Sequence, residues 1–154
     1  MRRARALLDS NVVIAALAEA HEHHAASLQL LETASVGEYA VAAHSFAEAF
    51  TTLTRRGTHA PFRWPADEAW AALESAAAQT QLIGLIPAQS FDAVRLFAAG
   101  GGIGARLYDH LIGQAAVISR VPAIVTWNVG HLRSLFPDVV VETPTTWLAR
   151  GRAE

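Results

Sequence analysis

Three features are missing from this sequence of 154 residues, and each absence excludes a class of protein. There is no cysteine, which excludes disulfides, thiolate zinc sites and cysteine nucleophiles. There is no lysine either, so all 12 basic side chains are arginine, and the formal net charge is −2. This charge argues against a wholly basic nucleic-acid binder, so any contact with nucleic acid must come from a local arginine patch. No apolar run approaches the ~20 residues of a membrane-spanning helix.

The length of the chain predicts one domain, residues 1–154. A chain of this size buries roughly 68–70% of its unfolded surface, which is enough for a core without disulfides or metals. The N-terminus, Met1–Arg5, is basic, but the apolar run after it is too short for a signal peptide. We therefore expect a cytoplasmic protein with no membrane association.

Short apolar segments alternate along the chain with longer segments of helical spacing. We expect strands near residues 7–9, 39–42, 82–86, 123–126 and 139–141. The expected helices span residues 11–18, 25–34, 45–55, 66–79, 90–98, 107–119 and 131–135. Alternating strands and helices predict an α/β fold with a parallel sheet and right-handed crossovers.

The first candidate for a functional residue is Asp9, at the end of the first apolar run. A carboxylate at the end of a buried strand lies where open α/β sheets bind their ligands. Asp, Ser and Asn are also favoured helix N-caps, so Asp9-Ser10-Asn11 could simply begin the first helix. The local pattern does not decide between these two interpretations.

Two further carboxylates lie near the starts of later helices. Glu48 stands three residues after Ser45, and this spacing is also that of a capping box. Asp109 lies in the first turn of a helix that carries no other charge before Arg120. An acid at that position suits the helix dipole, but its isolation in an uncharged helix favours a functional role as well.

Considered together, the three carboxylates point to a metal site. In a sheet with the first strand at its centre, Asp9 and Glu48 lie at the carboxyl edge, and Asp109 approaches that edge from the side. Three converging carboxylates repel one another and raise one another's pKa unless a cation lies between them. Oxygen ligands suit Mg²⁺ or Mn²⁺, and such an ion can generate a hydroxide nucleophile and stabilise a phosphoryl transition state.

Two other features carry weaker signals. The histidines His21, His23 and His24 could bind a transition metal, but no carboxylate or cysteine framework accompanies them, so a solvated turn is the preferred interpretation. Trp127, beside the expected site, is the one tryptophan that could stack on a base.

The sequence resembles a PIN-domain ribonuclease, specifically a VapC-type toxin of a bacterial toxin–antitoxin pair. Four segments carry the resemblance and occur in the family's order: LLDSNVVIAAL at 7–17, HSFAEAFTTLTR at 44–55, GARLYDHLIGQAA at 104–116 and IVTWNVGHLRSLFP at 124–137. The resemblance implies a three-layer α/β/α fold with a parallel sheet of about five strands. It also implies RNA cleavage that depends on Mg²⁺ or Mn²⁺, a homodimer, and inhibition by a cognate antitoxin protein.

The resemblance assigns roles to individual residues. Asp9 and Asp109 are the principal metal ligands, and Glu48 completes the acidic cluster. The residues expected to support the site through hydrogen bonds are Ser10, Asn11 and Thr126. Asn128 occupies a fourth catalytic position where many family members carry an acid, and this puts a strict two-metal mechanism in doubt.

The activity predicted from these residues is metal-dependent hydrolysis of RNA phosphodiester bonds. The arginines expected to hold the RNA backbone by charge are Arg55, Arg56, Arg106 and Arg133. The alternative is a catalytically weak PIN-fold module that binds RNA or a partner. A haloacid-dehalogenase-like phosphatase would need a second Asp at position 11 and a catalytic lysine, and the chain has Asn11 and no lysine.

Overall fold

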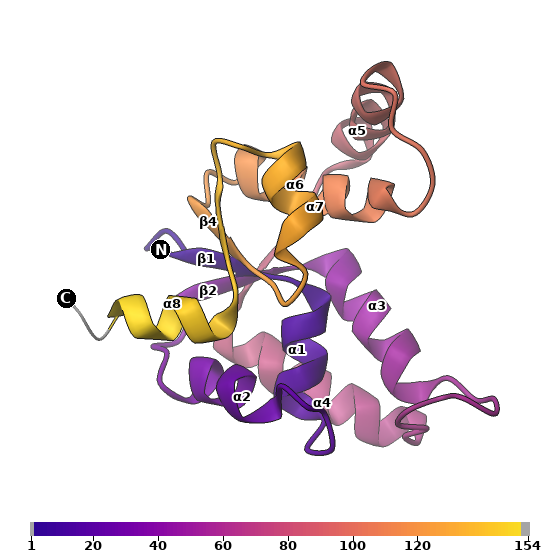
Figure 1. Cartoon of the computed structure of the whole chain (residues 1–154). Helices are drawn as coiled ribbons and strands as arrows, with labels where there is room; N and C mark the ends of the chain where they lie inside the picture. The colour runs from indigo at the N-terminus through magenta and orange to yellow at the C-terminus, as the bar shows by residue number, and fades with distance from the viewer. Residues whose placement is uncertain (1, 152–154) are drawn as a thin grey trace.

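The computed structural model describes residues 2–151, in which strands and helices alternate along most of the chain (Figure 1). The strands are β1 (Ala6–Leu8), β2 (Tyr39–Ala42), β3 (Gln81–Ile83), β4 (Ala123–Val125) and β5 (Val140–Glu142). The helices are α1 (Ser10–Leu17), α2 (His24–Glu32), α3 (Ala43–Thr54), α4 (Ala66–Gln79), α5 (Pro87–Ala99), α6 (Arg106–Ile118), α7 (Val129–Leu135) and α8 (Pro144–Gly151).

The five strands form one parallel sheet in the order β3-β2-β1-β4-β5. β1 is central, and its last residue, Leu8, pairs with Val41 on one side and Val125 on the other. The chain fills one side of β1 with β2 and β3 before it returns to the other side with β4 and β5. This places the topological switch point, where such sheets bind ligands, between the carboxyl ends of β1 and β4.

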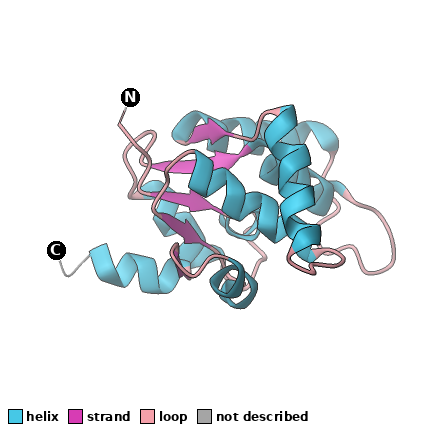
Figure 2. Ribbon diagram, turned by 90° about the horizontal axis from the view of Figure 1, so that it is seen from above, coloured by secondary structure: helices cyan, strands magenta, loops and turns pink. Residues whose placement is uncertain are grey.

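Helices cover both faces of the sheet, and alternate strand residues point into two separate cores (Figure 2). Leu8, Val41 and Val125 belong to the core beneath α1, α2, α3, α4 and α8. Leu7 and Ile124 belong to the core beneath α6 and α7. Both faces are buried, which explains why the central strands are continuously apolar rather than alternating. The predicted three-layer α/β/α fold is confirmed.

Several local expectations differ from the structure, among them the strand expected at 82–86, which is β3 at Gln81–Ile83. α3 begins at Ala43, directly after β2 and two residues before the expected start at Ser45. α5 begins at Pro87, which the fixed φ of proline favours in a first helical turn. α8, which the sequence did not predict, packs on α2, and its Trp147 Nε1 donates to Tyr39 Oη at 3.0 Å.

Within residues 2–151, no helix combines the length and the apolar character that crossing a bilayer requires.

Candidate active site

Asp9 lies at the switch point, immediately after β1. Its backbone N–H donates to Val125 O at 3.0 Å, so the strand pairing continues up to this residue. Its Oδ1 accepts a hydrogen bond from Ser10 N at 2.7 Å, which makes Asp9 the N-cap of α1. The side chain is nevertheless in the interior, because the residue is only 5% exposed. The capping interpretation is therefore correct, and it leaves Oδ2 available for other partners.

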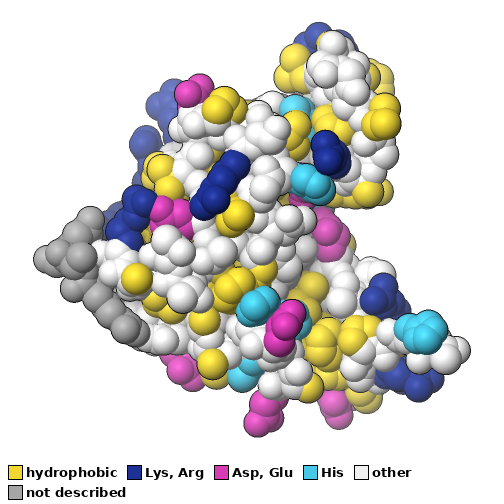
Figure 3. Space-filling view, in the orientation of Figure 1, with side chains coloured by type: hydrophobic (Ala, Val, Ile, Leu, Met, Phe, Trp, Pro, Cys, Tyr) yellow, Lys and Arg dark blue, Asp and Glu magenta, His cyan; other side chains and the backbone are white. Residues whose placement is uncertain are grey.

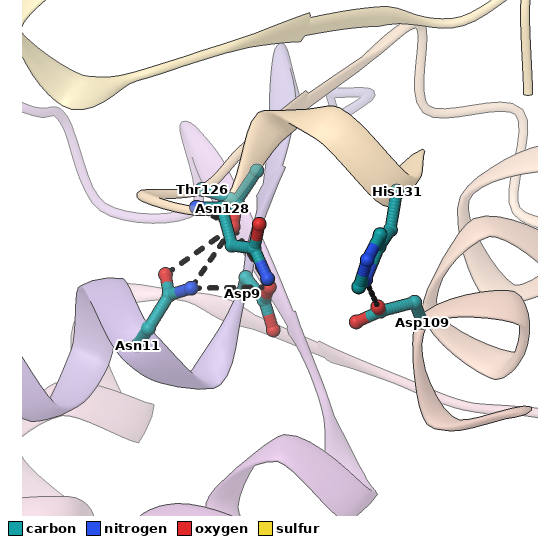
Figure 4. Close-up of polar contacts among 6 residues, drawn as sticks. All are labelled: Asp9, Asn11, Asp109, Thr126, Asn128 and His131. Carbon is teal, nitrogen blue, oxygen red and sulfur yellow. Dashed lines mark hydrogen bonds and ion pairs between the residues drawn. The ribbon is translucent and has the colours of Figure 1, made fainter. Parts of the chain in front are cut away.

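Thr126, the residue after β4, holds that second oxygen. Its buried hydroxyl donates to Asp9 Oδ2 at 2.9 Å and accepts from Asn11 Nδ2 at 3.0 Å and from Asn128 N at 3.1 Å. Asn11 Oδ1 in turn accepts from Trp127 N at 3.1 Å. These bonds join the start of α1 to the end of β4 across the switch point (Figure 4). The structure thus brings Asn11 and Thr126 to Asp9, as the sequence predicted.

Glu48 reaches the site from α3. The alternative interpretation of Glu48, a capping box with Ser45, is wrong: the N-cap of α3 is Ala42, and no side chain caps the helix. Ser45 therefore lies inside the first turn, where its hydroxyl is buried without a hydrogen-bond partner. Glu48 Oε2 instead accepts from Ser10 Oγ at 3.4 Å, which links α3 to α1. Its Oε1 is buried without a hydrogen-bond partner and lies 3.8 Å from His44 Nε2.

Asp109 lies on the other side of the site, in the first turn of α6. His131 of α7 contacts it, with His131 Nδ1 3.2 Å from Asp109 Oδ2. In Figure 4 the carboxylate of Asp109 faces Asp9 across a gap, with His131 beside it. Figure 3 shows this face of the molecule hollowed between α7 and α3, with acidic and histidine side chains around the hollow.

The carboxylates influence one another electrostatically. Burial raises the pKa of Asp9 above its ordinary value; the charge of Asp109 adds to this, and hydrogen bonds from Thr126 and Ser10 oppose it. Burial also raises the pKa of Glu48, and the charges of Asp9 and Asp109 raise it further. Among residues 2–151, no arginine forms an ion pair with any of the three carboxylates. The site therefore concentrates negative charge without an arginine to balance it, and its only basic neighbours among residues 2–151 within ion-pair distance are His44, beside Glu48, and His131, beside Asp109.

The oxygen atoms that line the site are of the kind that binds a hard divalent cation. They are carboxylate oxygens, one of which, Glu48 Oε1, is buried with no hydrogen-bond partner. The described part of the chain does not contain three His, Asp or Glu side chains already gathered into a metal site. An ion held here would therefore draw the outer carboxylates inward or complete its coordination with water, as Mg²⁺ usually does.

The four arginines predicted to bind RNA differ in their surroundings. Arg56 donates to the backbone oxygens of Arg63 and Trp64, and Arg133 Nε donates to Val141 O at 3.0 Å. All four are exposed, but Arg55, at the end of α3, and Arg106, at the start of α6, make no side-chain hydrogen bond to a described residue. The guanidinium groups of Arg55 and Arg106 therefore have more donors available for a phosphate than those of Arg56 and Arg133.

The sequence missed several contacts around the site. His131 carries no local signal, because its partner Asp109 is 22 residues away along the chain. The turn expected at residues 21–24 is present, but its histidines are only partly exposed, and His23 stacks on Trp127 with ring centroids 3.8 Å apart. His24 Nδ1 also lies 2.8 Å from Ala15 O. The stack covers one face of Trp127, whose Nε1 donates to Ser27 Oγ at 2.9 Å.

The fold and site together define a parallel α/β/α protein with an acidic centre at its topological switch point. The family model described as PIN domain matches residues 6–130, which is most of the chain. The chain belongs to the PIN domain family. The alignment includes Asp9, Glu48, Asp109 and Asn128 within its bounds.

Solved structures with a similar fold include three from bacteria. VapC20 of Mycobacterium tuberculosis, described as a sarcin-ricin loop cleaving toxin, is 12% identical with a TM-score of 0.65, over 83% of this chain and 93% of that one. VapBC2 of Rickettsia felis, bound to a promoter DNA fragment, is 16% identical with a TM-score of 0.59, and the match covers 89% of this chain and 96% of that one. FitAcB of Neisseria gonorrhoeae is 15% identical with a TM-score of 0.56, and the match covers 90% of this chain and 97% of that one. No curated protein matches the sequence. At these identities the structural likeness establishes the fold alone.

Proposed function

We propose that this protein is a Mg²⁺-dependent endoribonuclease and the toxin of a toxin–antitoxin pair. The observation that carries the proposal is the acidic centre: Asp9, Glu48 and Asp109 come from three different elements, and no arginine among the described residues balances their charge. Membership of the PIN domain family supports it. The description of VapC20 as a toxin that cleaves the sarcin-ricin loop supports RNA as the substrate.

Asp9, Asp109 and Glu48 would hold the ion, Mg²⁺ or Mn²⁺. A bound ion of this kind supplies a hydroxide nucleophile and stabilises the charge of a phosphoryl transition state. The chain's own task is to keep the ligands in place. Thr126 and Ser10 N each hold one oxygen of Asp9, and Asn11 fixes the position of Thr126.

The substrate would meet the site at the hollowed face between α7 and α3 (Figure 3). Arg55 and Arg106, both exposed, would hold the RNA backbone by charge. Unpaired bases would provide any sequence preference, because single-stranded RNA exposes its base edges.

The proposed partners are a cognate antitoxin and a second copy of the chain, in the cytoplasm. The neighbouring structure of VapBC2, a two-component assembly bound to promoter DNA, supports the antitoxin. The homodimer rests on the family resemblance.

A second function has two observations in its favour. Asn128 stands where many family members carry a fourth acid, and no three-ligand metal cluster is already assembled in residues 2–151. A catalytically weak module that binds RNA or a partner would also have these features. The two functions differ in whether RNA is cleaved when Mg²⁺ is added.

The test is RNA cleavage by the wild type, Asp9→Asn and Glu48→Gln, each with Mg²⁺ and with EDTA. The matched control is Asp138→Asn, which removes an exposed carboxylate between α7 and β5. We expect cleavage by the wild type and the control with Mg²⁺ only, and a loss of about 10³-fold in Asp9→Asn, the scale of one electrostatic element of an active site. Full activity of Asp9→Asn in EDTA would overturn the metallonuclease. Normal cleavage by Glu48→Gln would reduce the site to its two aspartates.

A further inference from the structure

The contact between His131 and Asp109 has no role in the proposed function so far. His131 Nδ1 lies 3.2 Å from Asp109 Oδ2, and the histidine side chain is 40% exposed. In an imidazole, a nitrogen that faces a carboxylate carries the hydrogen, so Nδ1 donates and Asp109 Oδ2 accepts. Asp109 Oδ1 has no such donor among the described residues and is left for another partner.

Asp109 needs an external restraint because of where it lies. It is in the first turn of α6, after a segment with four glycines, two of which, Gly101 and Gly104, have positive φ. Asp9 is fixed by bonds to a strand end, whereas Asp109 has only His131 as a hydrogen-bond partner in residues 2–151. The direction of the Asp109 carboxylate therefore depends on how α7 packs against α6.

That packing is unusually close. Gly113 lies one helical turn after Asp109, on the same face of α6, and a Cβ at position 113 would lie 1.9 Å from Phe136 Cε2 at the end of α7. Leu132, next to His131, is fully buried in the core beneath α6 and α7. Gly113 thus permits the approach of α7, and Leu132 anchors the turn that carries His131.

We propose that His131 is a positioning residue that holds one oxygen of Asp109 through Nδ1 and thereby directs the other oxygen toward the metal beside Asp9. This inference rests on the proposed function, since it assigns His131 a role at that same metal site. Hydrogen bonds from outside the coordination sphere to a ligand typically change metal affinity by about 10–100-fold. The effect of His131 should therefore fall on metal binding more than on the rate once metal is bound.

The test compares His131→Leu with His131→Asn, because the amide nitrogen of asparagine can replace Nδ1 as the donor and leucine cannot. The matched control is His59→Leu, an exposed histidine in the loop between α3 and α4. Direct Mn²⁺ binding is measured by calorimetry, and cleavage is measured against Mg²⁺ concentration. Thermal unfolding verifies that each variant is folded.

We expect His131→Leu to bind Mn²⁺ at least about tenfold more weakly, with its cleavage rate recovering as Mg²⁺ is raised. His131→Asn and His59→Leu should remain within about twofold of the wild type, a difference below 0.5 kcal/mol. Equal Mn²⁺ affinity in His131→Leu and wild type would overturn the inference and leave the proposed function intact. So would a His131→Asn variant that binds as weakly as His131→Leu. A wild type that binds no Mn²⁺ would overturn both.

Discussion

The two halves of the site are built in different ways. In the first half (Asp9, Asn11 and Thr126), Asp9 is 5% exposed, and bonds of 2.7 and 2.9 Å from Ser10 N and Thr126 Oγ1 hold its two oxygens. In the second half (Asp109 and His131), the Asp109 side chain is 26% exposed and has one side-chain hydrogen-bond partner among residues 2–151, His131 at 3.2 Å. The first half belongs to the sheet, and the second depends on one helix packing against another.

This difference indicates that the two halves contribute differently to stability and to metal binding. Hydrogen bonds between strand ends at a switch point are part of the folded core, so changes in the first half should affect stability and activity together. The second half depends on one hydrogen bond and on the packing of α7 against α6, so changes there should affect metal binding first. The following predictions test that difference between the two halves, from the largest expected effect on stability to the smallest.

Thr126→Val should produce the largest change in stability, because Thr126 is fully buried and serves three partners at once. The variant removes the shorter of the two hydrogen bonds to Asp9 Oδ2, leaving Asn11 Nδ2 at 3.5 Å, and it leaves Asn128 N without its acceptor. We expect the free energy of unfolding to fall by about 1–3 kcal/mol and cleavage by about 10–100-fold, measured by urea unfolding and an RNA assay. Thr126→Ser keeps the hydroxyl and should retain most of both. Equal losses in the two variants would contradict this role of the hydroxyl, because Thr126→Ser keeps it.

Gly113→Ala should destabilise the contact between α6 and α7 that supports Asp109 and His131, and it should do so through packing alone. The added Cβ would displace Phe136, and overpacking of this kind costs about 1–3 kcal/mol. Because α7 moves away from α6, we also expect weaker Mn²⁺ binding, measured by calorimetry. The matched control is Gly130→Ala in α7, where a Cβ meets no atom within 4 Å. If Gly113→Ala unfolds and binds like Gly130→Ala, the close contact between α6 and α7 does not hold the second half in place.

Asp9→Asn should stabilise the metal-free protein at neutral pH, the smallest of the three effects. Burial raises the pKa of Asp9 in the folded state, so the wild type gains stability below about pH 4, the ordinary value for Asp, and loses it as the pH rises through the raised pKa. We expect the variant to melt about 2–4 °C above the wild type at pH 7.5 in EDTA, and the difference to shrink toward pH 4. A variant that melts below the wild type at pH 7.5 would mean that the charge of Asp9 is already satisfied without a metal.

The sheet and most of the helices follow from local pattern and were predicted correctly. The apolar run that ends at Asp9 indicated a buried central strand, and the alternation of strands and helices indicated a parallel sheet, because both signals depend on periodicity and strand length. The same reasoning brought Asp9 to the edge where Thr126 also lies. The order of the strands therefore places Asp9 within hydrogen-bonding distance of Thr126, as well as of its neighbour Ser10.

The errors have a common physical cause. Ser45 and Glu48 have the spacing of a capping box, but α3 follows β2 without a loop, and only the tertiary position of β2 determines that start. His131 and Asp109 meet because Gly113 allows α6 and α7 to approach closely, and a single glycine within a helix does not reveal its neighbour. Contacts between helices distant in sequence leave no periodic signal.

The most direct test of the metal site is a crystal structure with Mn²⁺, recorded at a wavelength where manganese scatters anomalously. We predict an anomalous peak between the carboxylates of Asp9 and Asp109, with Glu48 on the same side and His131 still bonded to Asp109 Oδ2. A peak at the histidines near residues 21–24, or crystals that bind no manganese although the protein cleaves RNA, would contradict an acidic metal centre at the switch point of the sheet.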